Sequence, residues 1–442
     1  MMPASWTLTG SGTLPFLEGA LMTTPLLIAL LTVAPAADPA AEDPAWLHVR
    51  GGLPWTAAKI AGDGPVRVAF LGGSITEGNG YRPLVEEKLK ARFPDVAWEF
   101  HNAGVSSTGS TTGVFRYVGD AFGGGGDWPV GANLVVAEAA VNDDQDEQLP
   151  AGEAGWGMEG VARMSPLPRL AGPDLLFVHF PNPPIVEKLR AGEAPISVAA
   201  HERVAEHYAI PSVNVAAEVA RRIDAGTLSW EQYGGTHPGP VGHELAAEMI
   251  AEAIARGLVA PADRRETPAW PSRREPLRAD AIDIASLLRP GAEEKVEREF
   301  FAETVSADAA WATGVPDWEA LPGSCRDRFQ QTVLLHTAAP GATLTVDLEH
   351  AVALGLYVLA GPDAGALEVS APGEAPKVVQ LYHDHSKGLH YPRTVLLYRS
   401  DEPPAGPLTV KVVTGDHGGA AVRIVGVGIG IAVPKELRPD AP

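Results

Sequence analysis

Four residues suited to acyl transfer each stand close to an apolar run or a helix start. Ser74 lies in LGGSITEG, directly after VRVAFLG, and Gly104 lies in HNAGVSSTGS. Asn142 follows NLVVAEAAV, and His237 lies in GGTHPGPVGH, just ahead of a helical pattern. A serine hydroxyl is a poor nucleophile at neutral pH, so it requires a base within hydrogen-bond reach and donors for the oxyanion that forms. A hydroxyl, a backbone N–H, a side-chain amide and an imidazole provide that chemistry.

Each of these residues is weak evidence when it is taken alone. A serine after a strand is usually an N-cap or a turn residue, and an isolated Asn-Asp pair is usually a turn. A lone histidine before proline is usually structural or merely exposed. Their joint occurrence, in this order and after successive apolar runs, makes the signal specific.

The apolar runs are typical of buried parallel strands. Several are continuously apolar, as strands covered on both faces tend to be. Helical periodicity fills the intervals, as in YRPLVEEKLKARF. These patterns predict an α/β domain over 44–262, with a parallel, helix-covered sheet whose carboxyl edge gathers the loops that carry the four residues. The predicted strands cover 66–72, 97–104, 133–142, 174–180 and 210–215.

The composition and the hydrophobic pattern of the sequence change beyond residue 262. The segment PADRRETPAWPSRREPLRAD is rich in Pro and Arg, and it predicts a linker over 263–280. From about 331 to 431, short apolar runs such as ATLTVDL and LTVKVV alternate with Gly- and Pro-containing turns. This spacing predicts an all-β sandwich or jelly-roll domain over 281–436.

The blocks GGSITEG, NAGVSSTGS, AAVND and THPGPVGH together resemble those of the SGNH, or GDSL, hydrolases, which are esterases built on a flavodoxin-like, three-layer parallel sheet. The resemblance covers about 60–258. It implies that Ser74 is the nucleophile and that His237 is the general base and acid. It also implies an oxyanion hole formed by the N–H groups of Ser74 and Gly104 with the side-chain amide of Asn142. No cofactor is expected, and the expected partner is an acylated carbohydrate or another small ester.

One position departs from the family pattern. The family usually places an Asp three residues before the catalytic histidine, where this chain has Gly234. Such a carboxylate would fix the imidazole tautomer and stabilise the imidazolium. Either His237 is oriented by a backbone carbonyl or another acid, with Glu231 the nearest upstream candidate, or the site is impaired. We favour a Ser74–His237 dyad, because a main-chain carbonyl often holds the Nδ1–H of histidine.

The second domain resembles, over about 320–431, the β-domain attached to the SGNH module in some exported bacterial carbohydrate-active proteins. Its segment LYHDHSKGLHYP gathers aromatic and polar groups between two predicted strands. Such groups suit sugar stacking and hydrogen bonds to hydroxyls. The alternative is a domain that only covers and stabilises the hydrolase, or contributes a loop to its pocket. The candidate glycan-binding residues are Tyr382, His383, Asp384, His385 and His390.

The composition argues against several classes of function. The net charge is −21, with 34 Lys and Arg against 55 Asp and Glu, whereas a nucleic-acid partner requires a basic surface. The single cysteine, Cys325, excludes an internal disulfide and a thiolate metal cluster.

No metal is expected, since Asp143 and Asp144 fit a loop role. The histidines His201 and His207 are six residues apart, unlike those of HExxH zinc sites, and their segment predicts a solvated helix face.

The N-terminus predicts export to a secreted or periplasmic location. From Met22 the chain runs MTTPLLIALLTVAPAADPA, which has the size of a secretory h-region and ends in an Ala-Pro-Ala cleavage pattern. Residues 1–43 are therefore expected to be a signal peptide with an upstream extension, cleaved near Ala37. The apolar part is too short for a transmembrane helix, so no integral membrane segment is expected in the mature chain.

These observations predict an exported serine esterase that hydrolyses O-acetyl or other short acyl esters on carbohydrates. One alternative is a lipase or lysophospholipase of the same fold, although the sequence shows no apolar lid. Another is a non-catalytic glycan-binding protein with an impaired esterase site.

Overall fold

The computed structural model describes residues 43–62, 64–122, 131–146, 148–165, 173–259 and 274–433. The predicted signal peptide and its extension, up to residue 42, lie outside the described residues, as do residues 263–273 of the predicted linker. No helix in these described ranges combines the length and the apolar character that a membrane crossing requires.

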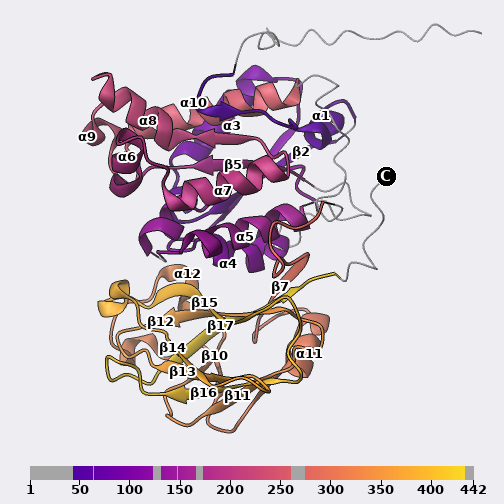
Figure 1. The fold of residues 1–442 in the computed structure, drawn as a ribbon, viewed down its shortest axis with the longest axis vertical. Coiled ribbons are helices and arrows are strands. Elements are labelled where there is room, and N and C mark those ends of the chain that lie inside the picture. The colour runs from indigo at the N-terminus through magenta and orange to yellow at the C-terminus, as the bar shows by residue number, and fades with distance from the viewer. Residues whose placement is uncertain are drawn as a thin grey trace, which may run out of the picture. The chain divides into compact units, whose positions relative to one another are not determined.

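A six-stranded sheet forms the N-terminal half (Figure 1). All of its strands pair in parallel except the short first one, which is antiparallel to its neighbour. This topology confirms the predicted α/β class. The strand order is β1 (Leu47–His48), β6 (Ser212–Asn214), β5 (Asp174–His179), β4 (Leu134–Glu138), β2 (Val66–Gly72) and β3 (Trp98–Gly104).

Strand side chains alternate between two cores, one on each face of the sheet. In β2, Val66, Val68 and Phe70 join the first core, and Ala69 and Leu71 join the second. The first core is covered by α1 (Pro54–Ile60), α3 (Tyr81–Arg92), α6 (Pro183–Arg190), α8 (Val215–Asp224) and α10 (Pro240–Leu258). The second is covered by α4 (Ser110–Arg116), α5 (Ala151–Met164) and α7 (Ile196–His207). The sheet is therefore the middle layer of three.

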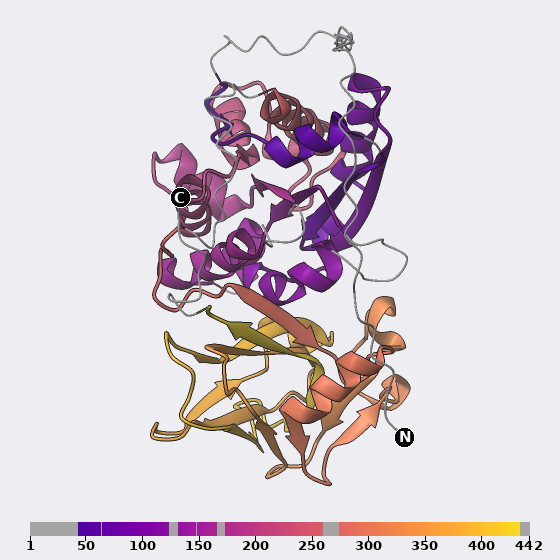
Figure 2. The same ribbon diagram turned by 90° about the vertical axis from the view of Figure 1, so that its right-hand side faces the viewer.

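Two antiparallel sheets make up the C-terminal half, and they appear from orange to yellow in Figures 1 and 2. Side chains of both sheets share one apolar core, which confirms the predicted all-β sandwich. One sheet has the order β15 (Tyr391–Arg399), β12 (Ala353–Ala360), β17 (Val422–Ile431), β10 (Leu334–Thr337) and β9 (Ala312–Gly314), with β7 (Ile284–Leu288) also paired to β17. The other has the order β14 (Lys377–Gln380), β13 (Ala366–Ser370), β16 (Leu408–Val413), β11 (Thr343–Val346) and β8 (Val305–Ala307).

The described residues of the two halves belong to one compact unit, and they share apolar contacts. Phe115 of α4 is 1% exposed and packs against the backbone of two sandwich strands. A Cβ at Gly355 of β12 would lie 2.7 Å from the Phe115 ring, and one at Gly428 of β17 would lie 2.6 Å from it. The missing side chains at these two glycines therefore make room for the ring.

Candidate active site

Ser74 and His237 are brought into hydrogen-bond contact. β2 ends at Gly72, and Ser74 is the first residue of the short helix α2 (Ser74–Glu77). His237 stands in the turn between α9 (Trp230–Tyr233) and α10. Ser74 Oγ lies 2.7 Å from His237 Nε2, although 163 positions separate the two residues. This is the geometry that a nucleophile and its general base require.

The backbone before Ser74 passes between two loops that leave no room for a side chain. A Cβ at Gly73 would lie 2.2 Å from Asn142 Oδ1 and 3.2 Å from the carbonyl oxygen of Thr108. Asn142 comes from the loop after β4, and Thr108 comes from the loop after β3. The loops that follow the three neighbouring strands therefore meet at Gly73, as the sheet topology predicts.

Asn142 is buried, and its side-chain amide nitrogen already donates one hydrogen bond. It is the first residue of the π-helical turn η2 (Asn142–Asp146), and its Nδ2 donates to Asp146 Oδ2 over 2.6 Å. Because an amide nitrogen carries two protons, one N–H is left to donate elsewhere. Asp146 also contacts the sandwich, since its carbonyl oxygen lies 2.8 Å from His383 Nε2. The candidate oxyanion residue is thus linked to the second domain.

The backbone N–H of Gly104 is paired within its own strand end. It donates to Asn102 Oδ1 over 2.9 Å. A Cβ at Gly104 would lie 2.4 Å from the backbone nitrogen of Glu77, so the glycine is needed for close packing of β3 against α2. This arrangement does not favour the predicted oxyanion role of Gly104, because its only donor is occupied.

The local backbone explains why Gly234 replaces the usual Asp. Gly234 has φ of 107°, and a Cβ there would lie only 1.9 Å from the backbone nitrogen of Gly239. No side chain, and so no carboxylate, fits at this position without a backbone shift. The turn that carries His237 therefore excludes the acid that the family pattern places there.

The structure does not bring Glu231 to His237. Glu231 is exposed in the first turn of α9, and hydrogen bonds from its own backbone N–H and from Ser229 lower its pKa. A carboxylate in this position serves the start of its own helix, so the prediction that it orients His237 is not supported. Within the described ranges, no hydrogen bond joins a carboxylate to Nδ1 of the exposed His237.

Sequence reasoning missed a buried carboxyl group beneath the Ser74 turn. Glu138, the last residue of β4, accepts hydrogen bonds at Oε1 from Gly73 N (2.7 Å) and from Thr76 Oγ1 (2.9 Å). Burial raises the pKa of Glu138 above its usual value, although these two hydrogen bonds act in the opposite direction. The available signal was an acid inside the apolar run LVVAEAAV, because an unpaired buried charge is costly and seldom accidental.

A buried pair, Asp143 and His201, lies close to Glu138. Asp143 accepts a hydrogen bond at Oδ1 from Ser110 N over 2.8 Å, and its Oδ2 lies 2.9 Å from His201 Nε2. His201 is fully buried, so the predicted solvated face is wrong at this position. The reason is that α7 packs against α5 and the loop after β4, which encloses the imidazole. The Asp143 contact with Ser110 fastens the loop after β4 to the loop after β3.

The five candidate glycan-binding residues differ in how far they are buried. His390 is fully buried against Trp318, with ring centroids 4.9 Å apart, and burial lowers its pKa to about 4. The prediction that His390 contacts a glycan is therefore wrong, because no ligand can reach a ring enclosed in the domain.

The other candidate residues lie nearer the surface. Tyr382 is half-buried and stacks on His417, with ring centroids 3.8 Å apart. His383 is half-buried and stacks on Tyr391, whereas Asp384 and His385 are exposed.

The fold, a mostly parallel α/β sheet followed by antiparallel β-sheets, is shared with solved two-domain esterases. A solved two-domain esterase, CEX, which is active on acetylated mannans, matches 88% of this chain and 99% of its own, with a TM-score of 0.62 and 20% identity. A CEX structure co-crystallised with mannopentaose matches over the same shares, with a TM-score of 0.60 and 20% identity. The sequence matches no protein-family model and no curated protein.

Proposed function

We propose that this protein is an exported serine esterase that removes acetyl or other short acyl groups from carbohydrates, with acetylated mannans as the first substrate to test. The 2.7 Å contact between Ser74 Oγ and His237 Nε2 carries the proposal. The activity of the CEX esterase on acetylated mannans supports the substrate class. Export rests on the sequence pattern that begins at Met22.

The reaction follows from the contact between the two side chains. Ser74 Oγ attacks the ester carbonyl while its proton moves to His237 Nε2. The tetrahedral intermediate collapses, the bond from the acyl carbon to the sugar oxygen breaks, and His237 returns the proton to that oxygen. Water, deprotonated by the same imidazole, then attacks the acyl-enzyme and releases the carboxylic acid and free Ser74. These steps need no cofactor.

The negative charge that develops on the carbonyl oxygen requires hydrogen-bond donors. In this proposal they are the backbone N–H of Ser74 and the second N–H of the Asn142 side chain. Gly104 contributes by letting β3 approach α2, since its own N–H is bound to Asn102. The oxyanion hole of this proposal is therefore built from the turn after β2 and the loop after β4.

His237 works in this proposal without a carboxylate partner. His237 is exposed, so solvent can stabilise the imidazolium, although less effectively than a buried acid does. The same observation favours one other candidate, a glycan-binding protein whose esterase site is impaired. The two candidates differ in whether ester turnover depends on Ser74.

The deciding experiment measures hydrolysis of p-nitrophenyl acetate, longer-chain homologues and acetylated mannan by the purified protein and by its Ser74→Ala variant. We expect turnover of the short ester and the mannan, and its loss in the folded variant. Turnover that persists without Ser74 would refute the assignment. Inertness toward all esters together with mannan binding would support the glycan-binding candidate, and a preference for long acyl chains would support a lipase.

A further inference from the structure

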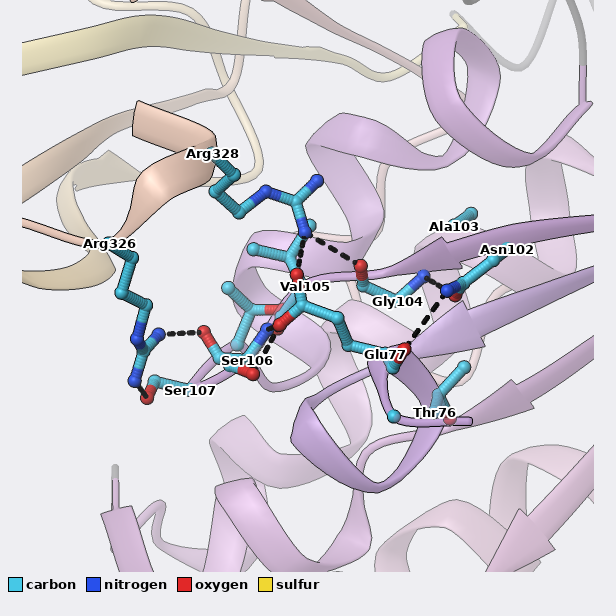
Figure 3. A network of polar contacts seen from close by, with 12 residues as sticks. Thr76, Glu77, Asn102, Ala103, Gly104, Val105, Ser106, Ser107, Arg326 and Arg328 are labelled. Carbon is cyan, nitrogen blue, oxygen red and sulfur yellow. Dashed lines mark hydrogen bonds and ion pairs between the residues drawn. The ribbon is translucent and has the colours of Figure 1, made fainter. Parts of the chain in front are cut away.

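The last residue of α2, Glu77, joins the Ser74 helix to two other parts of the molecule (Figure 3). Its Oε2 accepts hydrogen bonds from Ser106 N, over 2.8 Å, and from Ser106 Oγ. Its Oε1 forms an ion pair with Arg328 of the second domain. Burial alone would raise the pKa of Glu77, but the Ser106 hydrogen bonds and the Arg328 charge outweigh it, so the pKa lies below its usual value. A charged carboxylate therefore sits at this junction.

Two arginines of the second domain also hold the backbone of the loop after β3. Arg328, in the short helix α12 (Asp327–Gln330), donates to the carbonyl oxygen of Gly104 over 3.0 Å. Arg326, just before α12, donates to the carbonyl oxygen of Ser106 and to Ser107 Oγ, each over 2.8 Å. Figure 3 shows both guanidinium groups pointing from the second domain toward this loop. The contacts are to main chain and hydroxyl groups, so they fix the course of the loop.

The loop needs such support because part of it is strained. Ser107 has φ of 69°, in the left-handed region that non-glycine residues seldom adopt. Residues in such conformations persist only where the surroundings hold them, and they are concentrated at functional sites. Ser107 immediately precedes Thr108, whose carbonyl oxygen approaches Gly73. The strained residue thus lies between the arginine contacts and the backbone of the Ser74 turn.

We propose that Arg326 and Arg328 are positioning residues through which the second domain holds residues 104–108 against the Ser74 turn, and that the reaction rate depends on this contact. The inference rests on the proposed esterase function. It assigns the second domain a role in the chemistry of the first, beyond covering it. Neither arginine is required to touch the substrate.

These arginines are not needed to hold the two domains together. Phe115 and the glycine-lined strands already form an apolar contact between the domains. The Arg328 side chain is 40% exposed, and half-exposed ion pairs contribute little to stability. Removal of either guanidinium should therefore leave the protein folded, so that a loss of rate can be measured.

The experiment compares Arg326→Gln and Arg328→Gln with a control, Arg190→Gln, which breaks an exposed pair with Asp224 on α6 and α8. We expect kcat for p-nitrophenyl acetate to fall roughly tenfold in each test variant, since small misplacements of a site are costly. KM and the melting temperature should stay close to those of the control. A folded Arg328→Gln variant with unchanged kcat would overturn the inference.

A double-mutant cycle separates this role from a general loss of charge. If Glu77 and Arg328 act as one unit, Glu77→Gln combined with Arg328→Gln should lower kcat no further than the more severe single variant. If the losses of kcat from the two substitutions are additive instead, Glu77 and Arg328 do not act as one unit. If the glutamine variants unfold, Arg326→Lys and Arg328→Lys replace them, and wild-type kcat in both would overturn the inference. Inactivity of the wild-type protein would instead refute the proposed function, and this inference with it.

Discussion

The backbone N–H of Gly73 donates a 2.7 Å hydrogen bond to Glu138 Oε1, directly beneath the residue that we propose as nucleophile. Thr76, two residues beyond Ser74, donates to the same oxygen. The Glu138 carboxyl group thus holds the residues on both sides of Ser74, Gly73 before it and Thr76 after it. Burial raises the pKa of Glu138 and so disfavours its charged form, whereas the hydrogen bonds from Gly73 and Thr76 favour that form.

We expect Glu138→Ala to lower the free energy of unfolding by roughly 2–4 kcal/mol, because it opens a cavity and leaves the buried Gly73 N–H without an acceptor. The kcat of any esterase reaction should fall as well, since the Ser74 turn loses its support. Denaturant titration and ester kinetics measure the two effects. Glu138→Gln keeps an acceptor of the same shape and should remain close to wild type; equal damage in both variants would contradict this explanation.

Asn142→Ala tests the oxyanion assignment. Loss of an oxyanion donor costs about 10²-fold or more in kcat, while KM for a small ester should change little because the donor acts on the transition state. Asn79→Ala provides a control, since Asn79 is an exposed residue whose side chain accepts a hydrogen bond from Arg82. An Asn142→Ala variant with unchanged kcat would remove the amide from this role.

Gly234→Asp restores the acid of the family pattern, yet we expect it to reduce activity. A Cβ at this position would lie 1.9 Å from Gly239 N, so the turn that carries His237 must shift. The matched control is Gly235→Ala, because Gly235 also has a positive φ, of 95°, but has open space around its Cβ. The control should lose only about 1 kcal/mol of stability from the strained backbone. Higher kcat in Gly234→Asp would show that the turn can adapt.

Much of the fold could be predicted because its patterns are local. The run VRVAFLG became β2 over Val66–Gly72 without change, since a segment that is apolar apart from Arg67 tends to be buried on both faces of a sheet. The predicted strand over 133–142 was too long at its carboxyl end, where β4 stops at Glu138 and η2 begins at Asn142. Apolar character alone could not distinguish the buried residues between them from a strand.

The site could be predicted only in part, because some of its contacts join distant segments. The order of Ser74, Asn142 and His237 along the chain indicated which residues meet at the sheet edge. Contacts such as that of Arg328 with Gly104 depend on how two domains pack, and no local pattern records them. The burial of His390 had the same origin, since Trp318 covers it from a distant segment.

A last prediction concerns how stability depends on pH. Asp174, at the start of β5, is buried and accepts a hydrogen bond from Thr56 N over 2.7 Å. Burial raises its pKa from the ordinary 3.8 to about 7, against the effect of its hydrogen bonds. Between these values the folded protein binds a proton that the unfolded chain does not bind. Stability contributed by this group is therefore present below about pH 4 and is lost as pH rises through about 7.

Asp174→Asn should remove this dependence. The amide oxygen can still accept from Thr56, and no charge is buried, so the variant should be more stable than wild type at pH 8. The difference corresponds to roughly 4 kcal/mol at most, from about 1.36 kcal/mol per pH unit of the pKa difference. Urea titrations of both proteins from pH 5 to pH 8 measure it. Parallel curves for the two proteins would show that Asp174 has an ordinary pKa in the folded state.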